Sequence, residues 1–179
     1  MDDIYPYLQE KGLPIIAHCS PGDVVNRAQS KKAAQDNGKP AHYAAVFKAF
    51  PALKICLAHF GGINEWRRYL DNPWDPVAMQ DNWLAQILAM LRSGDYPNLY
   101  VDISYTLFNF QENVALLKLL LLEPAIRERV LFGSDYYLVA QQKYPEKRLS
   151  IDLRAALGEA LFWQIAYHNP RHFLAEPAA

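Results

Sequence analysis

The sequence predicts an α/β chain with about four parallel strands and flanking helices, arranged as part of a (β/α) barrel. Short apolar runs of strand length recur at intervals of roughly 40 residues, and helical patterns fill the stretches between them. Most of these runs end in a histidine, an acid or another polar residue. Parallel barrels place their reactive groups at the carboxyl ends of their strands, so this arrangement is typical of such a fold. Because only about four such units are present, we expect a partial barrel.

The bulk composition is that of a globular protein with one core. The chain has 179 residues, of which 51% are hydrophobic and 21% are charged, so we expect one domain over residues 1–179. Its formal net charge of −1 and the lack of a basic run predict no binding to nucleic acid, which favours a small-molecule substrate. The most apolar segment, Leu116–Leu122, is too short to cross a membrane. The acidic start of the chain lacks the pattern of a secretory signal, so we expect a cytoplasmic location.

The first β/α unit opens with a short helix. Residues Tyr5–Lys11 have the pattern of a helix end that Gly12 closes, and Leu13–His18 is the first apolar run. The stretch 19–39 is polar and contains several turn residues; a connection of this length without clear periodicity is typical of a lid or a flexible loop. Ala41–Phe50 then has the composition of a helix, with a proline before it and a proline after it.

The second unit contains the second apolar run, Leu53–His59. A short helix is expected over Ile63–Leu70. Asp81 or Asn82 can cap the next helix, in which large apolar residues repeat every three or four positions until Gly94 closes it. The apolar face of that helix should pack on the sheet.

The third and fourth strands are expected at Leu99–Ile103 and Val130–Phe132. Between them the sequence predicts a helix over Gln111–Leu122. After the fourth strand, Leu149–Tyr167 has a helical pattern with a break near Gly158. Strands that alternate with helices in this way predict a parallel sheet.

Three of the strand ends provide side chains that can bind a metal: His18, His59 and Asp135. Hydrolytic Zn²⁺ favours this ligand set, because these groups hold the ion and leave positions open for water or substrate. A single histidine at a strand end is more often a hydrogen-bonded structural residue, so the interpretation depends on all three residues. Because side chains alternate along a strand, an inward His18 predicts an inward Ile16, and an inward His59 predicts an inward Leu57.

Other polar residues near the strand ends have weaker interpretations. Asp102 is equally compatible with chemistry and with a structural role in which it orients loops through hydrogen bonds. Tyr105 and Tyr136 follow strand ends, where a hydroxyl can contact substrate, although the chain has 11 tyrosines. Arg27, in the long polar stretch, can bind a substrate carboxylate. Ser134 lacks the setting of a nucleophilic serine, so we interpret it as structural.

A pair of histidines near the end of the chain, His168 and His172, has the spacing of two ligands on one helix. Asn169-Pro170 lies between them and is expected to break the helix, with Asn169 as the cap of a last helical turn. We therefore expect no metal site from this pair.

The two cysteines, Cys19 and Cys56, have no metal or redox spacing. If the two strand-end histidines occupy equivalent positions, the cysteines are separated by roughly 13 Å. A disulfide spans only about 7 Å between Cα atoms, so we expect both thiols to be reduced core residues.

Five stretches together resemble the second half of the amidohydrolase-related barrel proteins, in the branch that includes aminocarboxymuconate-semialdehyde decarboxylase and the resorcylate-type decarboxylases. In chain order these stretches are Pro14–Cys19, Leu57–Gly62, Tyr100–Ser104, Leu131–Tyr136 and Asn169–Leu174. The resemblance covers nearly the whole chain and implies that its strands correspond to strands five to eight of an eight-stranded barrel.

The resemblance also implies roles for the strand-end residues. His18 corresponds to the metal ligand of the fifth strand, and Asp135 to the eighth-strand acid, which touches the metal and handles a proton. His59 corresponds to the sixth-strand histidine, an acid-base group in the decarboxylase-like members and a metal ligand in two-metal relatives. The implied cofactor is a divalent metal, zinc or manganese. The implied activity is hydrolysis or non-oxidative decarboxylation of a small organic substrate.

One feature of the family is missing from this sequence. Its first strand supplies a His-x-His metal pair, and the 179 residues contain no such pair. The chain is therefore expected to be catalytically incomplete and to bind metal weakly or not at all on its own. We expect it to be joined to a missing N-terminal half-barrel or to form a homo-oligomer that rebuilds the barrel. The alternative is a non-catalytic half-barrel scaffold or assembly partner with a vestigial site.

Overall fold

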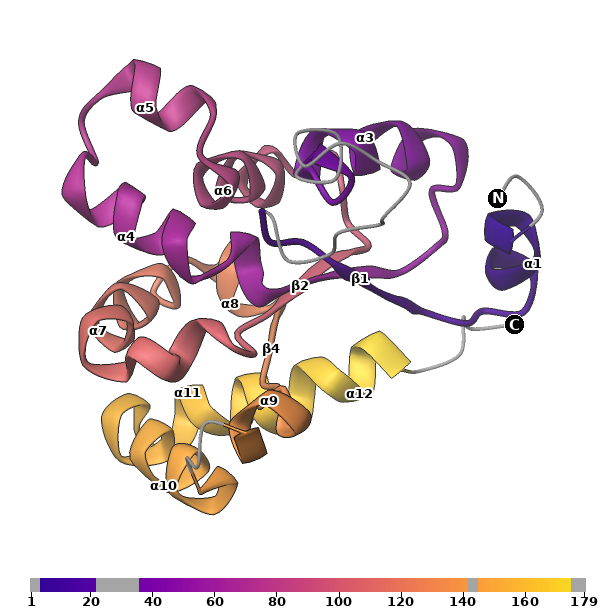
Figure 1. The fold of residues 1–179 in the computed structure, drawn as a ribbon. Coiled ribbons are helices and arrows are strands. Elements are labelled where there is room, and N and C mark those ends of the chain that lie inside the picture. Colours follow the sequence, from indigo (N-terminus) through magenta and orange to yellow (C-terminus); the bar gives the residue numbers. More distant parts are fainter. Residues whose placement is uncertain (1–3, 22–35, 142–144, 175–179) are drawn as a thin grey trace.

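The computed structural model of the chain describes residues 4–21, 36–141 and 145–174. Its sheet has the order β1-β2-β3-β4, with β1 at Ile15–His18, β2 at Ile55–Ala58, β3 at Leu99–Asp102 and β4 at Val130–Leu131. All three strand pairings are parallel, which confirms the predicted partial α/β barrel. Figure 1 shows the strands near the centre of the molecule, with helices around them. The predicted lid lies mostly outside the described residues, and Arg27 lies there too.

The helices connect the strands in the expected alternation. Their bounds are α1 (Ile4–Glu10), α3 (Pro40–Ala49), α4 (Ile63–Asp71), α5 (Pro76–Gln80), α6 (Trp83–Ser93), α7 (Phe110–Leu120), α8 (Pro124–Arg127), α9 (Tyr136–Gln141), α10 (Glu146–Leu157), α11 (Glu159–Trp163) and α12 (Asn169–Leu174), with short 3-10 turns at η1 (His59–Gly61) and η2 (Thr106–Asn109) and a π-helical turn at η3 (Gln164–His168). The sequence pattern did not predict α5 and α9, because five or six residues are too few to show a helical period.

The sheet is buried by different groups on its two faces. On one face, Ile55, Leu57 and Val101 belong to a large core that also contains apolar residues of α3, α4, α6, α7, α8 and α10. On the other face, Cys56 and Tyr100, with Leu131 of β4, pack against Phe173 of α12. Central strands buried on both faces explain the nearly continuous apolar runs in the sequence.

The expected orientation of β2 is wrong. The register pairs Ala17 with Leu57 and His18 with Ala58. Leu57 therefore lies on the face that packs in the large core and not on the face of His18. The reason is that His59 lies just beyond β2 and has a left-handed backbone, with φ 69°, so its ring does not follow the alternation of the strand.

The face of the sheet that carries His18 and Cys56, here called the inner face, is less covered at β1 than at β2 and β3. Ile16 is 67% exposed, although it shares the face of His18, whereas its register partner Cys56 is fully buried. This face of the sheet therefore exposes apolar area at β1. Over the described residues, no helix has the length and apolar character needed to span a membrane.

The C-terminal helices differ from expectation at one of two predicted breaks. Gly158, with φ 77°, ends α10 as predicted. The break predicted at Asn169 is wrong, because its backbone is helical (φ −63°, ψ −44°) and η3 continues into α12. The side chain of Asn169 does not cap α12 but donates to the carbonyl oxygens of Val130 (2.6 Å) and Arg127 (2.7 Å). His168 and His172 are both exposed.

The π-helical turn also touches the sheet. The carbonyl oxygen of Ile165 accepts the backbone N–H of Phe132, which directly follows β4, at 2.9 Å. Figure 1 shows α11 and α12 running beneath β4. The C-terminal helices thus supply a hydrogen bond at the outer margin of β4.

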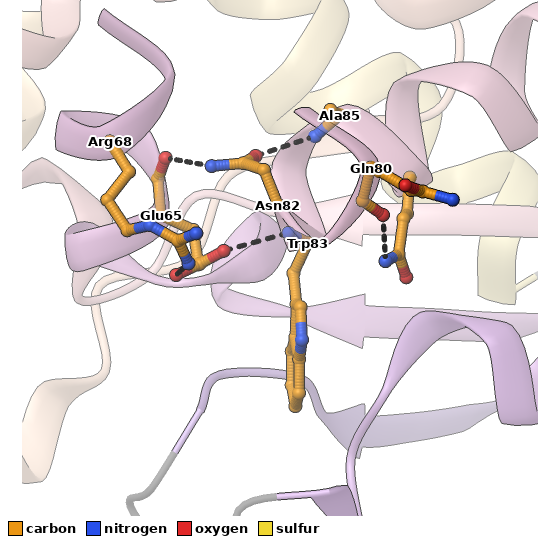
Figure 2. Close-up of polar contacts among 7 residues, drawn as sticks. Glu65, Arg68, Gln80, Asn82, Trp83 and Ala85 are labelled. Carbon is orange, nitrogen blue, oxygen red and sulfur yellow. Dashed lines mark hydrogen bonds and ion pairs between the residues drawn. The ribbon is translucent and has the colours of Figure 1, made fainter. Parts of the chain in front are cut away.

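A polar cluster fixes the helices that follow β2. Glu65 of α4 is 3% exposed, and its carboxylate accepts the backbone N–H of Trp83 at 2.9 Å and a guanidinium N–H of Arg68 at 2.8 Å. Asn82 donates to the carbonyl oxygen of Glu65 at 2.8 Å and caps α6 by accepting the N–H of Ala85 at 2.9 Å (Figure 2). These bonds hold the start of α6 against α4, which begins two residues after the end of η1.

Candidate functional site

The structure brings two of the predicted site residues together. His18 is the last residue of β1, and His59 directly follows β2. The Nε2 atom of His59 lies 3.1 Å from the Nδ1 atom of His18, and the ring centroids are 4.8 Å apart. Two nitrogen ligands at about 2.1 Å on a tetrahedral ion are roughly 3.4 Å apart. The two rings therefore have nearly the spacing needed to bind one divalent ion.

The backbone at His59 is unusual and is held by several contacts. Both His59 (φ 69°) and Phe60 (φ 47°) adopt left-handed conformations, which are strained for residues other than glycine. The hydroxyl of Thr106 donates to the carbonyl oxygen of His59 at 2.5 Å, and the indole of Trp66 donates to that of Phe60 at 2.9 Å. Gly61 must be a glycine here, because a Cβ at this position would lie 2.8 Å from the backbone nitrogen of Leu84.

Asp102, at the end of β3, organises the loops beside the histidine pair. It is 8% exposed, and its Oδ1 atom accepts the backbone N–H groups of His59 and Ser104, each at 3.0 Å, as well as the hydroxyl of Ser104. The thiol of Cys56 lies 3.7 Å from Oδ2. This arrangement supports the structural interpretation of Asp102, because its carboxylate joins the ends of two strands.

The two thiols are free, as predicted, and both are fully buried. Burial, and secondarily the negative charge of Asp102, raises the pKa of the Cys56 thiol well above its ordinary value. The same two causes raise the pKa of Cys19. Both thiols therefore stay protonated at neutral pH and are poor nucleophiles.

Asp135 is placed differently from the two histidines. It precedes α9 and has a left-handed backbone, with φ 55°. Within the part of the chain that the structure describes, no three His, Cys, Asp or Glu side chains are arranged to hold a metal ion, and His18, His59 and Asp135 do not form such a group. The roles of Asp135 as metal ligand and catalytic acid stay predictions.

The predicted substrate-contacting tyrosines have different surroundings. The ring of Tyr105 is 6.2 Å from that of His59 and 4.8 Å from that of Phe108, centroid to centroid. Phe108 in turn lines a surface hollow of about 360 Å³ that also involves Arg148 of α10. Tyr136 directly follows Asp135 and is 67% exposed. Tyr105 thus lies beside the histidine pair, whereas Tyr136 lies on the surface.

Sequence reasoning missed one residue of this site. The hydroxyl of Ser104 lies 3.0 Å from Nδ1 of His59. Ser104 is 7% exposed, and in the sequence it is only the polar end of a strand pattern. Its position two residues after Asp102 was the available signal, because a serine there can share hydrogen bonds with the aspartate.

Comparison with known protein families identifies the family of this chain. A family model described as Amidohydrolase matches residues 1–175. The chain belongs to the amidohydrolase family. No curated protein matches this amidohydrolase-family chain in a direct comparison.

Several solved structures resemble this amidohydrolase-family chain in fold. An uncharacterised TIM-barrel protein from Bordetella bronchiseptica has a TM-score of 0.55 and 19% identity over 96% of this chain and 48% of its own. A 2,6-dihydroxybenzoate decarboxylase from Rhizobium has a TM-score of 0.50 and 19% identity over 97% of this chain and 55% of its own. A dihydroxybenzoic acid decarboxylase from Polaromonas sp. JS666, solved with manganese and the inhibitor 2-nitroresorcinol, has a TM-score of 0.51 and 18% identity over 97% of this chain and 54% of its own. The chain spans about half the length of these barrel proteins.

Proposed function

We propose that this chain carries the second-half site of a metal-dependent enzyme that hydrolyses or non-oxidatively decarboxylates a small organic substrate. The observation that supports this most directly is the 3.1 Å separation between Nδ1 of His18 and Nε2 of His59 at the ends of neighbouring strands. Family membership supports the same kind of chemistry. The manganese in the Polaromonas structure favours a divalent ion, which we propose to be zinc or manganese.

The residues of the chain have distinct proposed roles. His18 and Asp135 would hold the ion, and when bound the ion supplies Lewis-acid polarisation of an oxygen. His59 would act through Nε2, the ring nitrogen that faces His18. It would take up or release a proton there or, as the resemblance to two-metal relatives implies, bind the ion. Tyr105 lies beside His59 and is proposed to contact substrate, and the same role is proposed for Tyr136. Arg27 is proposed to bind a substrate carboxylate.

The site needs groups from outside this chain. A catalytic zinc site commonly has three protein ligands, and His18 and Asp135 would supply two. We propose that a first-half barrel, either a missing N-terminal half or a second copy of this chain, provides the rest. The 67% exposure of Ile16, on the face of His18, supports a partner at this surface.

Analytical ultracentrifugation tests whether a partner associates with the face of β1 that carries Ile16. Replacing Ile16→Glu should weaken association with a second copy or with a coexpressed half-barrel. Ile151→Glu is the matched control, because Ile151 has a similar exposure (64%) but lies on α10. Equal association in the two variants would contradict a partner at the inner face of β1.

The competing proposal is a non-catalytic scaffold with a vestigial site. It is favoured by the finding that His18, His59 and Asp135 do not form a three-residue metal group within the described residues. A scaffold would also share the family fold without needing the rest of the metal ligands.

Metal binding distinguishes the two proposals. The purified chain is dialysed against zinc or manganese and its metal content is measured. An enzyme half-site should bind zinc, weakly, and lose it in His18→Ala and in His59→Ala. His168→Ala is the control, because this histidine is exposed and is not predicted to bind metal. A wild-type chain that takes up no metal would support the scaffold. Genomic sequence upstream of Met1 with an in-frame His-x-His after an apolar run would support the enzyme.

A further inference from the structure

The contacts of His59 indicate that its Nδ1 atom, the ring nitrogen that faces away from His18, carries a hydrogen. Its Nδ1 atom lies 3.2 Å from the backbone carbonyl oxygen of Ser104 and 3.0 Å from the hydroxyl oxygen of the same residue. A carbonyl oxygen only accepts hydrogen bonds, so the first contact requires a hydrogen on Nδ1. Two acceptors from one residue thus face the same ring nitrogen.

The hydroxyl contact gives the same assignment independently. The hydroxyl of Ser104 donates its hydrogen to Oδ1 of Asp102, because an ionised carboxylate has no hydrogen to give. The hydroxyl oxygen is then left as an acceptor toward His59. Asp102 also accepts the backbone N–H groups of both His59 and Ser104, so the three groups are held in one geometry.

We propose that Ser104 and Asp102 are positioning residues that hold neutral His59 in the tautomer with hydrogen on Nδ1. A neutral imidazole carries hydrogen on one nitrogen only, and the hydrogen bond made by that nitrogen selects the tautomer. Nε2 therefore presents its lone pair toward His18. This inference rests on the proposed function for its purpose, because both a metal ligand and a general base need that lone pair.

The assignment has a consequence for His18. Its Nδ1 atom is 3.1 Å from Nε2 of His59. A hydrogen bond at this distance needs one donor, and since His59 supplies the lone pair, neutral His18 supplies the N–H. An ion held between these two atoms would need a lone pair from each, so His18 would have to change its tautomer to bind such an ion, whereas His59 would not.

Nitrogen NMR of the chain labelled with ¹⁵N-histidine tests the proposal without any activity. At a pH where the rings are neutral, long-range ¹H–¹⁵N spectra should show hydrogen on Nδ1 and none on Nε2 of His59. A wild-type ring with hydrogen on Nε2 would overturn the proposal, whether or not any variant folds.

Substitutions then test which residues set the tautomer. Ser104→Ala removes the hydroxyl acceptor and should shift part of the His59 population to the other tautomer, because the carbonyl acceptor remains. It should weaken zinc binding about tenfold. Ser104→Thr restores a hydroxyl and should restore the tautomer. If Ser104→Ala changes neither the tautomer nor the zinc affinity, Ser104 has no positioning role.

Thr106→Val is the matched control. Thr106 is fully buried and donates to the carbonyl oxygen of His59, but it does not touch the ring. This variant should lower the unfolding temperature and leave the tautomer as in wild type. If the wild-type chain binds no zinc but shows the expected tautomer and its loss in Ser104→Ala, the proposed function fails and the positioning role stands.

Discussion

The carboxylate of Asp102 accepts the backbone N–H of His59 at 3.0 Å, although 43 residues separate them in the sequence. This bond joins the end of β3 to the turn that follows β2. Asp102→Ala should leave the N–H groups of His59 and Ser104 without their acceptor in a buried setting, and should destabilise the chain by about 2–4 kcal/mol. Urea unfolding measures the change.

Asp102→Asn is the comparison for that variant. An asparagine keeps one oxygen that can accept the same backbone groups, so its loss of stability should be clearly smaller. Equal losses in the two variants would mean that the negative charge, rather than the acceptor, holds the two loops together.

The capping residue of α6 should contribute more to the free energy of unfolding than the capping residue of α5. Asn82 is fully buried, caps α6 and donates to the carbonyl oxygen of Glu65. Asn82→Ala should cost about 2 kcal/mol, because it removes a cap and leaves a buried carbonyl without a donor. Asp75 caps α5 in an exposed position, so Asp75→Ala should cost about 0.5–1 kcal/mol. Thermal unfolding of the two variants checks the order, and a reversed order would contradict it.

Gly133 should be needed for the geometry around His59. A Cβ at this position would lie 3.3 Å from Cβ of Ser104 and 3.8 Å from Cγ of Asp102. Gly133→Ala should therefore push Ser104 and weaken zinc binding by the purified chain. Gly94→Ala is the control: its φ of 76° makes the change cost about 1 kcal/mol, but it has no neighbour within 4 Å and is far from the histidine pair in sequence. Equal zinc affinity in both variants would contradict this prediction, because a Cβ at residue 133 would then not disturb the zinc site.

Alkaline pH should destabilise the chain through its buried thiols. Burial raises the pKa values of Cys19 and Cys56 above the ordinary value of 9.0. Above that value the thiols ionise in the unfolded chain and remain protonated in the folded one, so stability falls as pH rises. Each thiol should contribute about 1.4 kcal/mol per pH unit. Burial also raises the pKa of Tyr43 to about 12, which adds to the loss at still higher pH.

Unfolding in urea across this pH range measures the effect, and a Cys19→Ala, Cys56→Ala double variant is the control. A pH dependence that is the same in the double variant would contradict the role of the thiols. In the wild type, a thiol reagent should react with both cysteines only when the chain unfolds.

The sequence was sufficient for the features that depend on periodicity and on turn residues. The apolar runs ending at His18 and His59 gave two strand ends that meet in space, because parallel strands in register bring their carboxyl ends to one edge. Asn82 also caps the start of α6, and Gly94 its end, as their residue types predict. Patterns of this kind reflect local backbone preferences and burial, which a single sequence records.

Features that depend on a few dihedral angles were not predictable. The left-handed backbone at His59 and Phe60 is held by Thr106, 47 residues from His59, and by Trp66, six residues from Phe60. Neither residue type signals this backbone conformation. It turned the side chain of His59 away from the orientation that strand alternation predicts. The hydrogen bond between Ser104 and His59 exists only once β2 and β3 are adjacent, so the sequence alone does not show it.

The bond from Phe132 to the carbonyl oxygen of Ile165 makes the two margins of the sheet unlike. One margin already has a hydrogen-bonding neighbour from its own C-terminal helices, while the other ends at a strand whose Ile16 remains two-thirds in solvent. Any strand added along the outer edge of β4 would compete with Ile165 for the backbone N–H of Phe132.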